Sequence, residues 1–438
     1  MSTVYQSWGR YPKADHEVIP IYWRGNCLPP TKGPNGLLCY GLGRSYGDCC
    51  LNDGGRLLAT RGLNRFIRFD AENGVLGCES GVSLDEVLRL TVPKGWFLPV
   101  TPGTSFVTIG GAIANDVHGK NHHKAGAFGN FVDRLCLLRS DGSRLICSED
   151  SNPALFRATI GGLGLTGLIE WAEFRLTPIC NAYVDVETIR FGDLSEFIAL
   201  SRENEAGFDY LVAWIDGTAS GRSLGRGLFL CGNHNSDPGR GSHDSGSASR
   251  ISLPVDLPSF VLNPLTVRAF NELYYRKQIR RESRAVAHFR PFFYPLDAIG
   301  NWNRLYGSRG LLQWQCLVPL DAGIEVLREI LSQISGSGIA SFLGVMKTMG
   351  SVPSRGPIAF SGRGVTLALD FQMKDNALVL LRKLSDIVAE AGGRIYAAKD
   401  ACMTPEHFQT FYPRWRELET ARDPAFSSNL WRRVTSNS

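Results

Sequence analysis

Several features that would place a protein in a special class are missing from this sequence. It has no apolar run of about 18 residues or more, and its N-terminal stretch, MSTVYQSWGRYPKADHE, has neither a basic start nor an apolar core, so we predict no membrane-spanning helix and no secretory leader. The 47 basic and 42 acidic residues form no long run of one charge. Because nucleic-acid-binding arms carry such basic runs, we predict no nucleic-acid partner.

The sequence also lacks a disulfide framework. Its 11 cysteines are odd in number and form no C-x-x-C pair, whereas small secreted domains carry dense and even sets of cysteines. We therefore expect free thiols in a reducing compartment and predict a cytoplasmic protein. A peripheral contact with the inner face of the membrane stays open, because the segment 270–290 is basic and contains two adjacent tyrosines, Tyr274 and Tyr275. Its other interpretation is a solvated helix face.

Motifs for covalent hydrolysis, metal binding and nicotinamide binding are absent or lie in the wrong context. There is no G-x-S-x-G motif. His118 and His122 have the spacing of a helical zinc site, but Gly119 stands where a metallohydrolase needs an acid, so we predict no metal. A G-x-G-x-x-G match at 162–167 follows a predicted helix at 153–160 and precedes a predicted strand. A Rossmann fingerprint requires the reverse context, so we predict no such fold.

The chain is long enough for two domains. With 438 residues, 43% of them hydrophobic, it exceeds what one small core needs. Near residue 182 glycine clusters give way to longer alternating runs, which predicts a first domain over 1–182, completed by 394–438, and a second domain over 183–393. Predicted strands at 311–318 and 364–371 alternate with predicted helices at 322–335 and 376–391. This order predicts an α+β protein in which helices cover the antiparallel sheet of the second domain.

Shorter patterns predict individual elements. Ser83 precedes the helical spacing of 84–90, which predicts a capped helix. Asp141 and Gly142 stand between two apolar runs, which predicts a hairpin. Residues 233–250 are polar, rich in glycine and serine and without periodicity, which predicts a mobile loop.

Glycine is concentrated in the stretch 99–129, which holds six glycines and three of the eight histidines. Such a density is costly in chain entropy unless the backbone turns sharply or approaches another group closely, so we expect this stretch to wrap a large ligand. A second glycine-rich segment, 41–48, follows an apolar run and contains Arg44 and Ser45. It is either an anion-binding loop, with its N–H groups directed at the ligand, or a plain tight turn.

Five motifs follow one another along the chain: 41–48 (GLGRSYGD), 102–104 (PGT), 108–112 (TIGGA), 116–123 (DVHGKNHH) and 161–167 (GGLGLTG). In this order and spacing they resemble the vanillyl-alcohol-oxidase-type, or PCMH-type, flavoproteins. The branch of that family that acts on polyprenyl-phosphoryl ribose is also similar at 213–216, 270–277 and 398–400. The resemblance therefore spans nearly the whole chain.

The resemblance implies FAD, bound noncovalently between two small α/β subdomains. Its pyrophosphate is expected against the loop 41–45 and the turn 102–104, because N–H groups of glycine turns suit an anion. Its ring is expected near the three residues to which the family assigns catalysis, where a lysine would stabilise the reduced flavin. These catalytic residues are Lys399, Tyr46 and His118. The full predicted FAD set is Gly41, Leu42, Gly43, Arg44, Ser45, Tyr46, Pro102, Gly103, Thr104, Val107, Gly110, Gly111, Ala114, Asn115, His118, Gly119, Gly164, Ile169, Tyr396 and Lys399.

The resemblance further implies a sugar substrate bound by the second domain. The matching positions are Trp214, Gln313, Gln315, Lys347, Thr366 and Ala368. Ala368 stands where the polyprenyl-ribose branch carries a cysteine, and Thr366 where that branch carries an asparagine. No physical argument from the sequence assigns a role to His122 and His123.

The activity implied is oxidation of a secondary sugar hydroxyl, the 2′-hydroxyl of a polyprenyl-phosphoryl-β-D-ribose. The product would be a 2-keto sugar, the first half of an epimerisation in the synthesis of a cell-wall arabinose donor. An NAD(P)H-dependent reductase would be the partner for the second half. Two alternatives stay open: a soluble aldonolactone or alditol oxidase that uses oxygen, and a flavin-binding partner in glycan synthesis without turnover.

Overall fold

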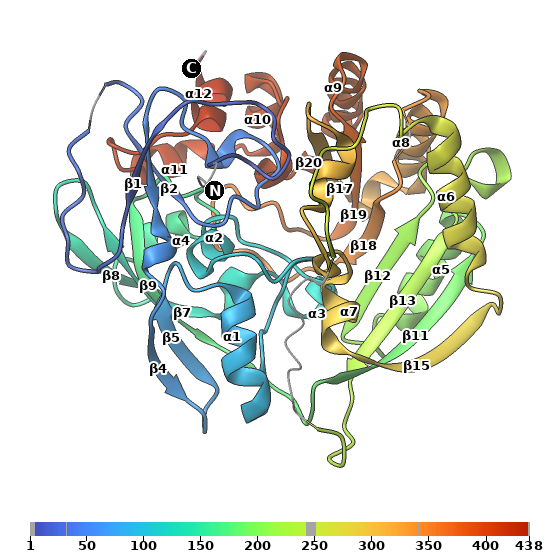
Figure 1. Ribbon diagram of the computed structural model, residues 1–438, viewed down its shortest axis with the longest axis horizontal. Coiled ribbons are helices and arrows are strands. Elements are labelled where there is room, and N and C mark those ends of the chain that lie inside the picture. The colour runs from blue at the N-terminus through green and yellow to red at the C-terminus, as the bar shows by residue number, and fades with distance from the viewer. Residues whose placement is uncertain (1–4, 32, 242–250, 340, 437–438) are drawn as a thin grey trace.

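The computed structural model of the chain describes residues 5–31, 33–241, 251–339 and 341–436. It combines helices with largely antiparallel sheets in an α+β arrangement, as we predicted (Figure 1). A three-stranded and a five-stranded sheet lie in one half of the molecule, on the left in Figure 1, and an eight-stranded sheet forms the other half.

The first half contains both smaller sheets. The three-stranded sheet is parallel, in the order β1 (Glu17–Pro20), β3 (Arg56–Ala59), β2 (Leu37–Tyr40). The five-stranded sheet is antiparallel, in the order β4 (Phe66–Asp70), β5 (Val75–Glu79), β9 (Leu168–Arg175), β7 (Val132–Leu138), β8 (Arg144–Ser148). A short ladder pairs β6 (Trp96–Phe97) with β10 (Thr177–Pro178).

Helices of the first half come from two distant parts of the chain. The N-terminal part supplies α1 (Leu84–Thr91), α2 (Ile109–Ala114), α3 (His122–Ala125) and α4 (Pro153–Thr159). The C-terminal part supplies α10 (Pro405–Phe411), α11 (Trp415–Ala421) and α12 (Asn429–Thr435). Helix α11 packs on α4, and α12 packs on the short helix η1 (Asp48–Cys50). The C-terminal end thus lies against the N-terminal glycine-rich segment.

The second half is one antiparallel sheet with helices on it. Its strand order is β15 (Glu282–His288), β11 (Tyr183–Phe191), β13 (Gly227–His234), β12 (Tyr210–Ile215), β18 (Gly344–Met349), β19 (Gly364–Gln372), β17 (Leu311–Pro319), β20 (Arg394–Ile395). The helices of this part are α5 (Leu194–Asn204), α6 (Pro264–Arg276), α7 (Phe289–Phe293), α8 (Ile324–Gly336) and α9 (Asp375–Glu390), and a two-residue ladder joins β14 (Ile251–Ser252) to β16 (Ile299–Gly300).

The register of the large sheet separates a core face from a second face. Ala213, Met346, Leu367 and Cys316 are neighbours across β12, β18, β19 and β17, and each side chain is completely buried. These residues belong to the apolar cluster that also includes the inner side chains of α5, α8 and α9. Because side chains alternate along a strand, the next residues in each strand point to the opposite face.

The local predictions agree with the structure at several points. Ser83 caps α1 and forms a capping box with Glu86. Strands β7 and β8 form the predicted hairpin. The G-x-G-x-x-G segment follows α4 and opens β9, so the Rossmann context is absent there. The strands and helices predicted between 311 and 391 are β17, α8, β19 and α9.

In three segments the structure departs from a prediction or does not cover it. The basic segment 270–290 is not one helix: it comprises the end of α6, a turn, β15 and the start of α7. Of the predicted loop 233–250, the first two residues still belong to β13, and 242–250 lie outside the described residues. The domain boundary at 182 stays a prediction. Strand β20 pairs with β17 of the large sheet, although we expected the chain from 394 onwards to complete the first domain.

A buried ion triad holds three distant segments together. The Arg433 guanidinium of α12 contacts Asp48 Oδ1 at 2.7 Å and Asp400 Oδ2 at 2.9 Å. The side chains of Asp48 and Asp400 are 4% and 2% exposed. Gly47 allows this contact because a Cβ there would lie 1.5 Å from the Asp400 carbonyl oxygen. The triad therefore joins α12 to the segments that end in Asp48 and Asp400.

Replacing Arg433 should destabilise the fold strongly. In Arg433→Met both carboxylates stay buried without their cation, and we expect the free energy of unfolding to fall by about 3–5 kcal/mol in urea titrations. Arg414→Met is the matched control, because Arg414 pairs with Glu417 on an exposed surface and should cost less than about 1 kcal/mol. Equal losses in the two variants would contradict the proposed importance of the triad.

Candidate active site

Two glycine-rich segments approach each other at the start of the site. Gly41 lies against Thr108, the N-cap of α2, so closely that a Cβ would be 2.4 Å from the Thr108 hydroxyl oxygen. Gly43 has φ +61°, and a Cβ there would lie 2.0 Å from the Tyr40 hydroxyl. Glycine is required at both positions, because any side chain would clash. The loop 41–45 is thereby packed on the beginning of α2.

This loop presents free backbone donors. Within the described part of the chain, the N–H groups of 42–45 and of 103–104 donate no hydrogen bond to the protein. The Arg44 guanidinium lies 4.0 Å from the centroid of the Trp8 ring, and its Nε is buried without a partner. Burial lowers the pKa of Arg44, and nearby Asp297 partly offsets this. Free N–H groups beside a buried cation fit a phosphate anion.

His118 stands in an aromatic wall between the two halves. Its ring centroid lies 5.1 Å from that of Tyr396 and 5.3 Å from that of Phe360. The Tyr396 hydroxyl donates to the Asn115 carbonyl at 2.7 Å, which joins the returning C-terminal segment to the end of α2. The three rings are tilted relative to one another rather than coplanar, and aromatic side chains gathered in this way offer a mostly apolar surface to a ring system.

One hydrogen bond orients the His118 ring. Its Nε2 lies 2.9 Å from the Gln315 side-chain nitrogen, which also donates to the Thr366 hydroxyl at 2.8 Å. With the amide as donor, Nε2 accepts and the ring proton is on Nδ1, which has no partner among the described residues. Burial, followed by the charge of Lys347, lowers the pKa of His118 well below its usual value. The imidazole is therefore neutral.

The second face of the large sheet carries the predicted substrate residues. Trp214, Val345, Ala368 and Gln315 are neighbours across β12, β18, β19 and β17, in the row next to the completely buried one. Thr366 pairs with Lys347, and Gln313 pairs with Asp370. By alternation these side chains also point to this face. The core face and the site face are thus the two sides of the same strands.

Three ionisable groups at the site are removed from water: Lys347 and Asp370 on this face, and Lys399 in the short helix η9 (Ala397–Lys399). Burial, then the charges of Lys399 and Lys120, lowers the pKa of Lys347 to about 7. Burial also lowers the pKa of Lys399, which the negative charge of Asp370 opposes. The pKa of Asp370 is raised by burial, and the Gln313 side-chain amide donates a hydrogen bond to its carboxylate. Perturbed groups gathered in one place are typical of active sites.

A family model described as an FAD binding domain matches residues 35–148. The decaprenylphosphoryl-beta-D-ribose oxidase of Mycolicibacterium smegmatis is 37% identical over 434 residues, covering 96% of this chain and 93% of that protein. The chain belongs to the decaprenylphosphoryl-β-D-ribose oxidase family. It is an FAD-dependent oxidoreductase, as we predicted.

Two further relatives differ in how much of this chain they match. An uncharacterized protein in the mprA 5′ region of Streptomyces coelicolor is 32% identical over 369 residues, covering 81% of this chain and 100% of that protein. The L-gulonolactone oxidase 5 of Arabidopsis thaliana is 28% identical over 198 residues, 41% of this chain and 33% of that protein. The similarity to that oxidase is therefore confined to part of each chain.

The residues present fit FAD. The free N–H groups of 42–45 and 103–104, with the unpartnered Arg44 Nε, suit its pyrophosphate. Tyr46 directly follows the N–H groups of 42–45, and its own N–H donates to the Ala398 carbonyl at 3.1 Å. The Lys399 Nζ lies 5.6 Å from the centroid of the Tyr46 ring. These contacts bring the predicted catalytic residues Tyr46 and Lys399 together, and their roles stay predictions.

Other predicted site residues lie on or next to α2, β9, β18 and β12. Gly110 and Gly111 open α2, and the Ala114 carbonyl accepts a hydrogen bond from Leu163, which precedes Gly164. Ile169 belongs to the apolar core cluster of the first half. The Lys347 ammonium donates to the Gly119 carbonyl at 3.3 Å. The indole N–H of Trp214 donates to the Phe342 carbonyl, at the end of the row furthest from Gln315.

Sequence reasoning missed three residues at the site. Asp370 could have been found from alternation, because Thr366, Ala368 and Asp370 are two residues apart in one strand. Tyr306 and Phe360 belong to no recognisable motif. Tyr306 lies close enough to Asp370 to feel its charge. Burial and that charge together raise the pKa of Tyr306 well above the usual value. Phe360 packs on Tyr396 with centroids 4.8 Å apart.

His122 has a structural role that the sequence did not suggest. Its Nδ1 accepts from the Gly350 N–H at 3.3 Å, and the side chain is completely enclosed. Burial, then the charge of Lys347, lowers its pKa to about 3. The nearby His123 binds the Phe208 carbonyl through Nε2 at 2.9 Å. Both histidines therefore tie α3 to the second half of the molecule.

Acid should destabilise the protein partly through His122. Because its pKa falls from 6.5 to about 3 on folding, its contribution is complete above pH 6.5 and is lost as the pH falls towards 3. There the unfolded chain binds a proton that the folded chain does not. We expect the free energy of unfolding of His122→Asn to depend less on pH in this window, by up to about 1.4 kcal/mol per pH unit. Identical slopes in urea titrations of both proteins would contradict this role.

Proposed function

We propose that this chain oxidises the 2′-hydroxyl of a polyprenyl-phosphoryl-β-D-ribose to the 2-keto sugar. The observation that carries the proposal is the similarity over 96% of the chain to an oxidase of decaprenylphosphoryl-β-D-ribose. The chain also presents a polar sheet face opposite a site that fits FAD. In this proposal the first half has the PCMH-type FAD-binding fold, and FAD is held without a covalent bond.

Three side chains at the site, Gln315, Lys399 and Lys347, have a task in this proposal. FAD, when bound, supplies a hydride acceptor. Gln315 orients neutral His118, and the buried cation Lys399 would offset negative charge that develops in the site. Lys347, with a pKa of about 7, would gain a proton near an anionic substrate phosphate, because an opposite charge favours the charged form.

Ala368 distinguishes this chain within the proposed activity. It lies between Val345 and Gln315 on the site face and is partly exposed there. The position carries no thiol, so hydride removal in this chain has no sulfur participant at residue 368. The product, a 2-keto sugar, requires reduction to complete an epimerisation, and we propose an NAD(P)H-dependent keto-sugar reductase as the partner.

Anaerobic mixing tests the substrate. We expect polyprenyl-phosphoryl-β-D-ribose, dispersed in detergent, to bleach the flavin absorbance of the purified protein. Free alditols and aldonolactones should leave the absorbance unchanged. Bleaching by a free sugar with rapid peroxide formation in air would instead favour a soluble oxidase. No bleaching by either class would favour a flavin-binding partner without turnover.

Lys399 should matter for the rate of that bleaching. In Lys399→Met the site loses a buried cation, and we expect the rate constant of flavin reduction to fall by about 100-fold or more, as for the loss of one electrostatic stabiliser. Lys383→Met is the control, because Lys383 lies on the exposed side of α9 and contacts Gln333. An unchanged rate in Lys399→Met, with flavin still bound, would overturn the assigned role.

A further inference from the structure

The outer side of α6 carries apolar side chains that are exposed to solvent, which is unfavourable for such side chains. Leu265, Ala269 and Leu273 are four residues apart and form one stripe along the helix. The side chains of Leu265 and Leu273 are 80% and 72% exposed, and that of Ile279, just beyond the helix, is 85% exposed. Phe260, before the helix, is 74% exposed. Exposed apolar side chains grouped in this way mark an interaction surface.

The same surface is basic. From Pro264 to Arg284 the chain has six basic residues and two acidic ones, Glu272 and Glu282. Within the described residues, Arg268 and Arg280 have no ion-pair partner. Arg276, Arg281 and Arg284 pair with carboxylates but keep most of their side chains exposed. The surface therefore complements an anionic partner. Figure 1 shows α6 beside the large sheet on the right of the molecule, and β15 as the edge strand of that sheet.

The inner side of α6 leads to the substrate face. The Tyr274 ring lies 4.6 Å from the ring of Trp214, centroid to centroid. Phe270 packs edge-on against Phe342, which stacks on Tyr306 with centroids 5.5 Å apart. Aromatic side chains thus continue from the exposed stripe to Trp214 and Tyr306, both of which border the site.

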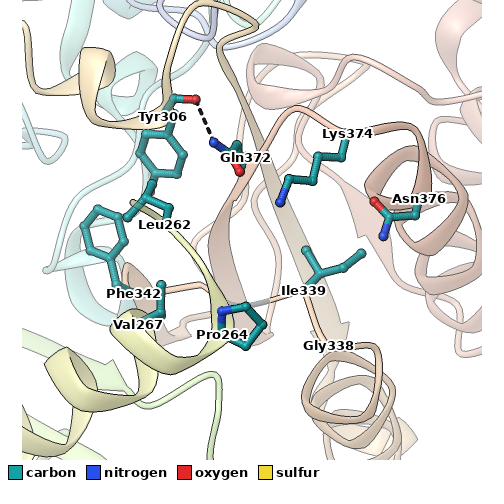
Figure 2. A pocket seen from close by; sticks show the side chains of 10 residues that line it. All are labelled: Leu262, Pro264, Val267, Tyr306, Gly338, Ile339, Phe342, Gln372, Lys374 and Asn376. Carbon is teal, nitrogen blue, oxygen red and sulfur yellow. Dashed lines mark hydrogen bonds between the residues drawn. The ribbon is translucent and has the colours of Figure 1, made fainter. Parts of the chain in front are cut away.

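A pocket opens beside this aromatic path (Figure 2). Pro264 and Val267 of α6 form one wall, together with Leu262 and Phe342. Figure 2 shows Gln372 and Lys374 on the opposite wall, with the Gln372 amide donating to the Tyr306 carbonyl. An apolar tail that runs from the exposed stripe of α6 towards the site would therefore contact the apolar wall of this pocket.

We propose that the stripe of α6 and the basic turn after it dock on an anionic lipid bilayer. The docked surface comprises Leu265, Leu273, Ile279, Arg268 and Arg280. The inference rests on the proposed function, since a polyprenyl substrate lies in a membrane and its tail has to leave the bilayer next to the site. Apolar side chains flanked by arginines enter the headgroup region, where apolar burial and attraction to anionic lipids add together.

Vesicle sedimentation tests the docking in the absence of substrate. We expect the flavin-loaded protein to bind vesicles of phosphatidylcholine with phosphatidylglycerol more tightly than vesicles of phosphatidylcholine alone, and the difference to shrink in high salt. Leu273→Asn with Ile279→Asn should weaken binding roughly tenfold or more. Arg268→Gln with Arg280→Gln should weaken it about fivefold per charge, and only on anionic vesicles.

Val379→Asn is the matched control, because Val379 is a 68% exposed apolar residue on α9. It should bind vesicles as the unchanged protein does. Equal binding by the Leu273/Ile279 variant, or no preference for anionic vesicles, would overturn the proposal. It would then point to a protein partner or to no partner at this surface.

Detergent-dispersed substrate separates this inference from the proposed function. The Leu273/Ile279 variant should reduce its flavin at the normal rate with polyprenyl-phosphoryl ribose in detergent, but slowly with the same lipid in vesicles. If the unchanged protein oxidises the substrate in detergent but does not bind vesicles, the docking proposal is contradicted and the proposed function stands. If the protein binds vesicles but oxidises the substrate neither in detergent nor in vesicles, the proposed function is contradicted and the docking proposal stands.

Discussion

The contact of Arg433 with Asp48 and Asp400 is the constraint on which the site depends. Ion groups with so little access to water cost free energy unless they are paired, so the three segments that carry them have one favourable arrangement. Asp48 ends the segment that contains Tyr46, and Asp400 follows Lys399 directly. The Tyr46 N–H also binds the Ala398 carbonyl. The positions of two proposed catalytic side chains therefore follow from the docking of the last helix.

A second constraint is the division of the large sheet into two faces. The same strands supply a completely buried row and, one residue away, the row that carries Gln315 and Ala368. Because the buried row packs on α8 and α9, a slip of one residue would turn the polar side chains into the core. The packing energy of the core thus keeps the site side chains in register.

Burial accounts for the electrostatic character of the site. Desolvation lowers the pKa values of Arg44, Lys120, Lys347 and Lys399, so each of these groups gains from an anion placed beside it. The pyrophosphate of FAD has that charge, and so does the phosphate of the proposed substrate. A cluster of desolvated cations costs the fold free energy, and proteins retain such clusters mainly where binding or catalysis needs them.

The sequence by itself determined the local elements, the absence of a Rossmann context and, through five ordered motifs, the FAD-binding family. Periodicity and capping act between near neighbours, so the α1 capping box and the β7–β8 hairpin could be predicted from a few residues. Only the tertiary structure decided that the charge of Asp370 acts on Lys399, that Gln315 orients His118 and that His122 anchors α3. These contacts join segments far apart in the chain, and they depend on register and helix docking, which no local pattern encodes.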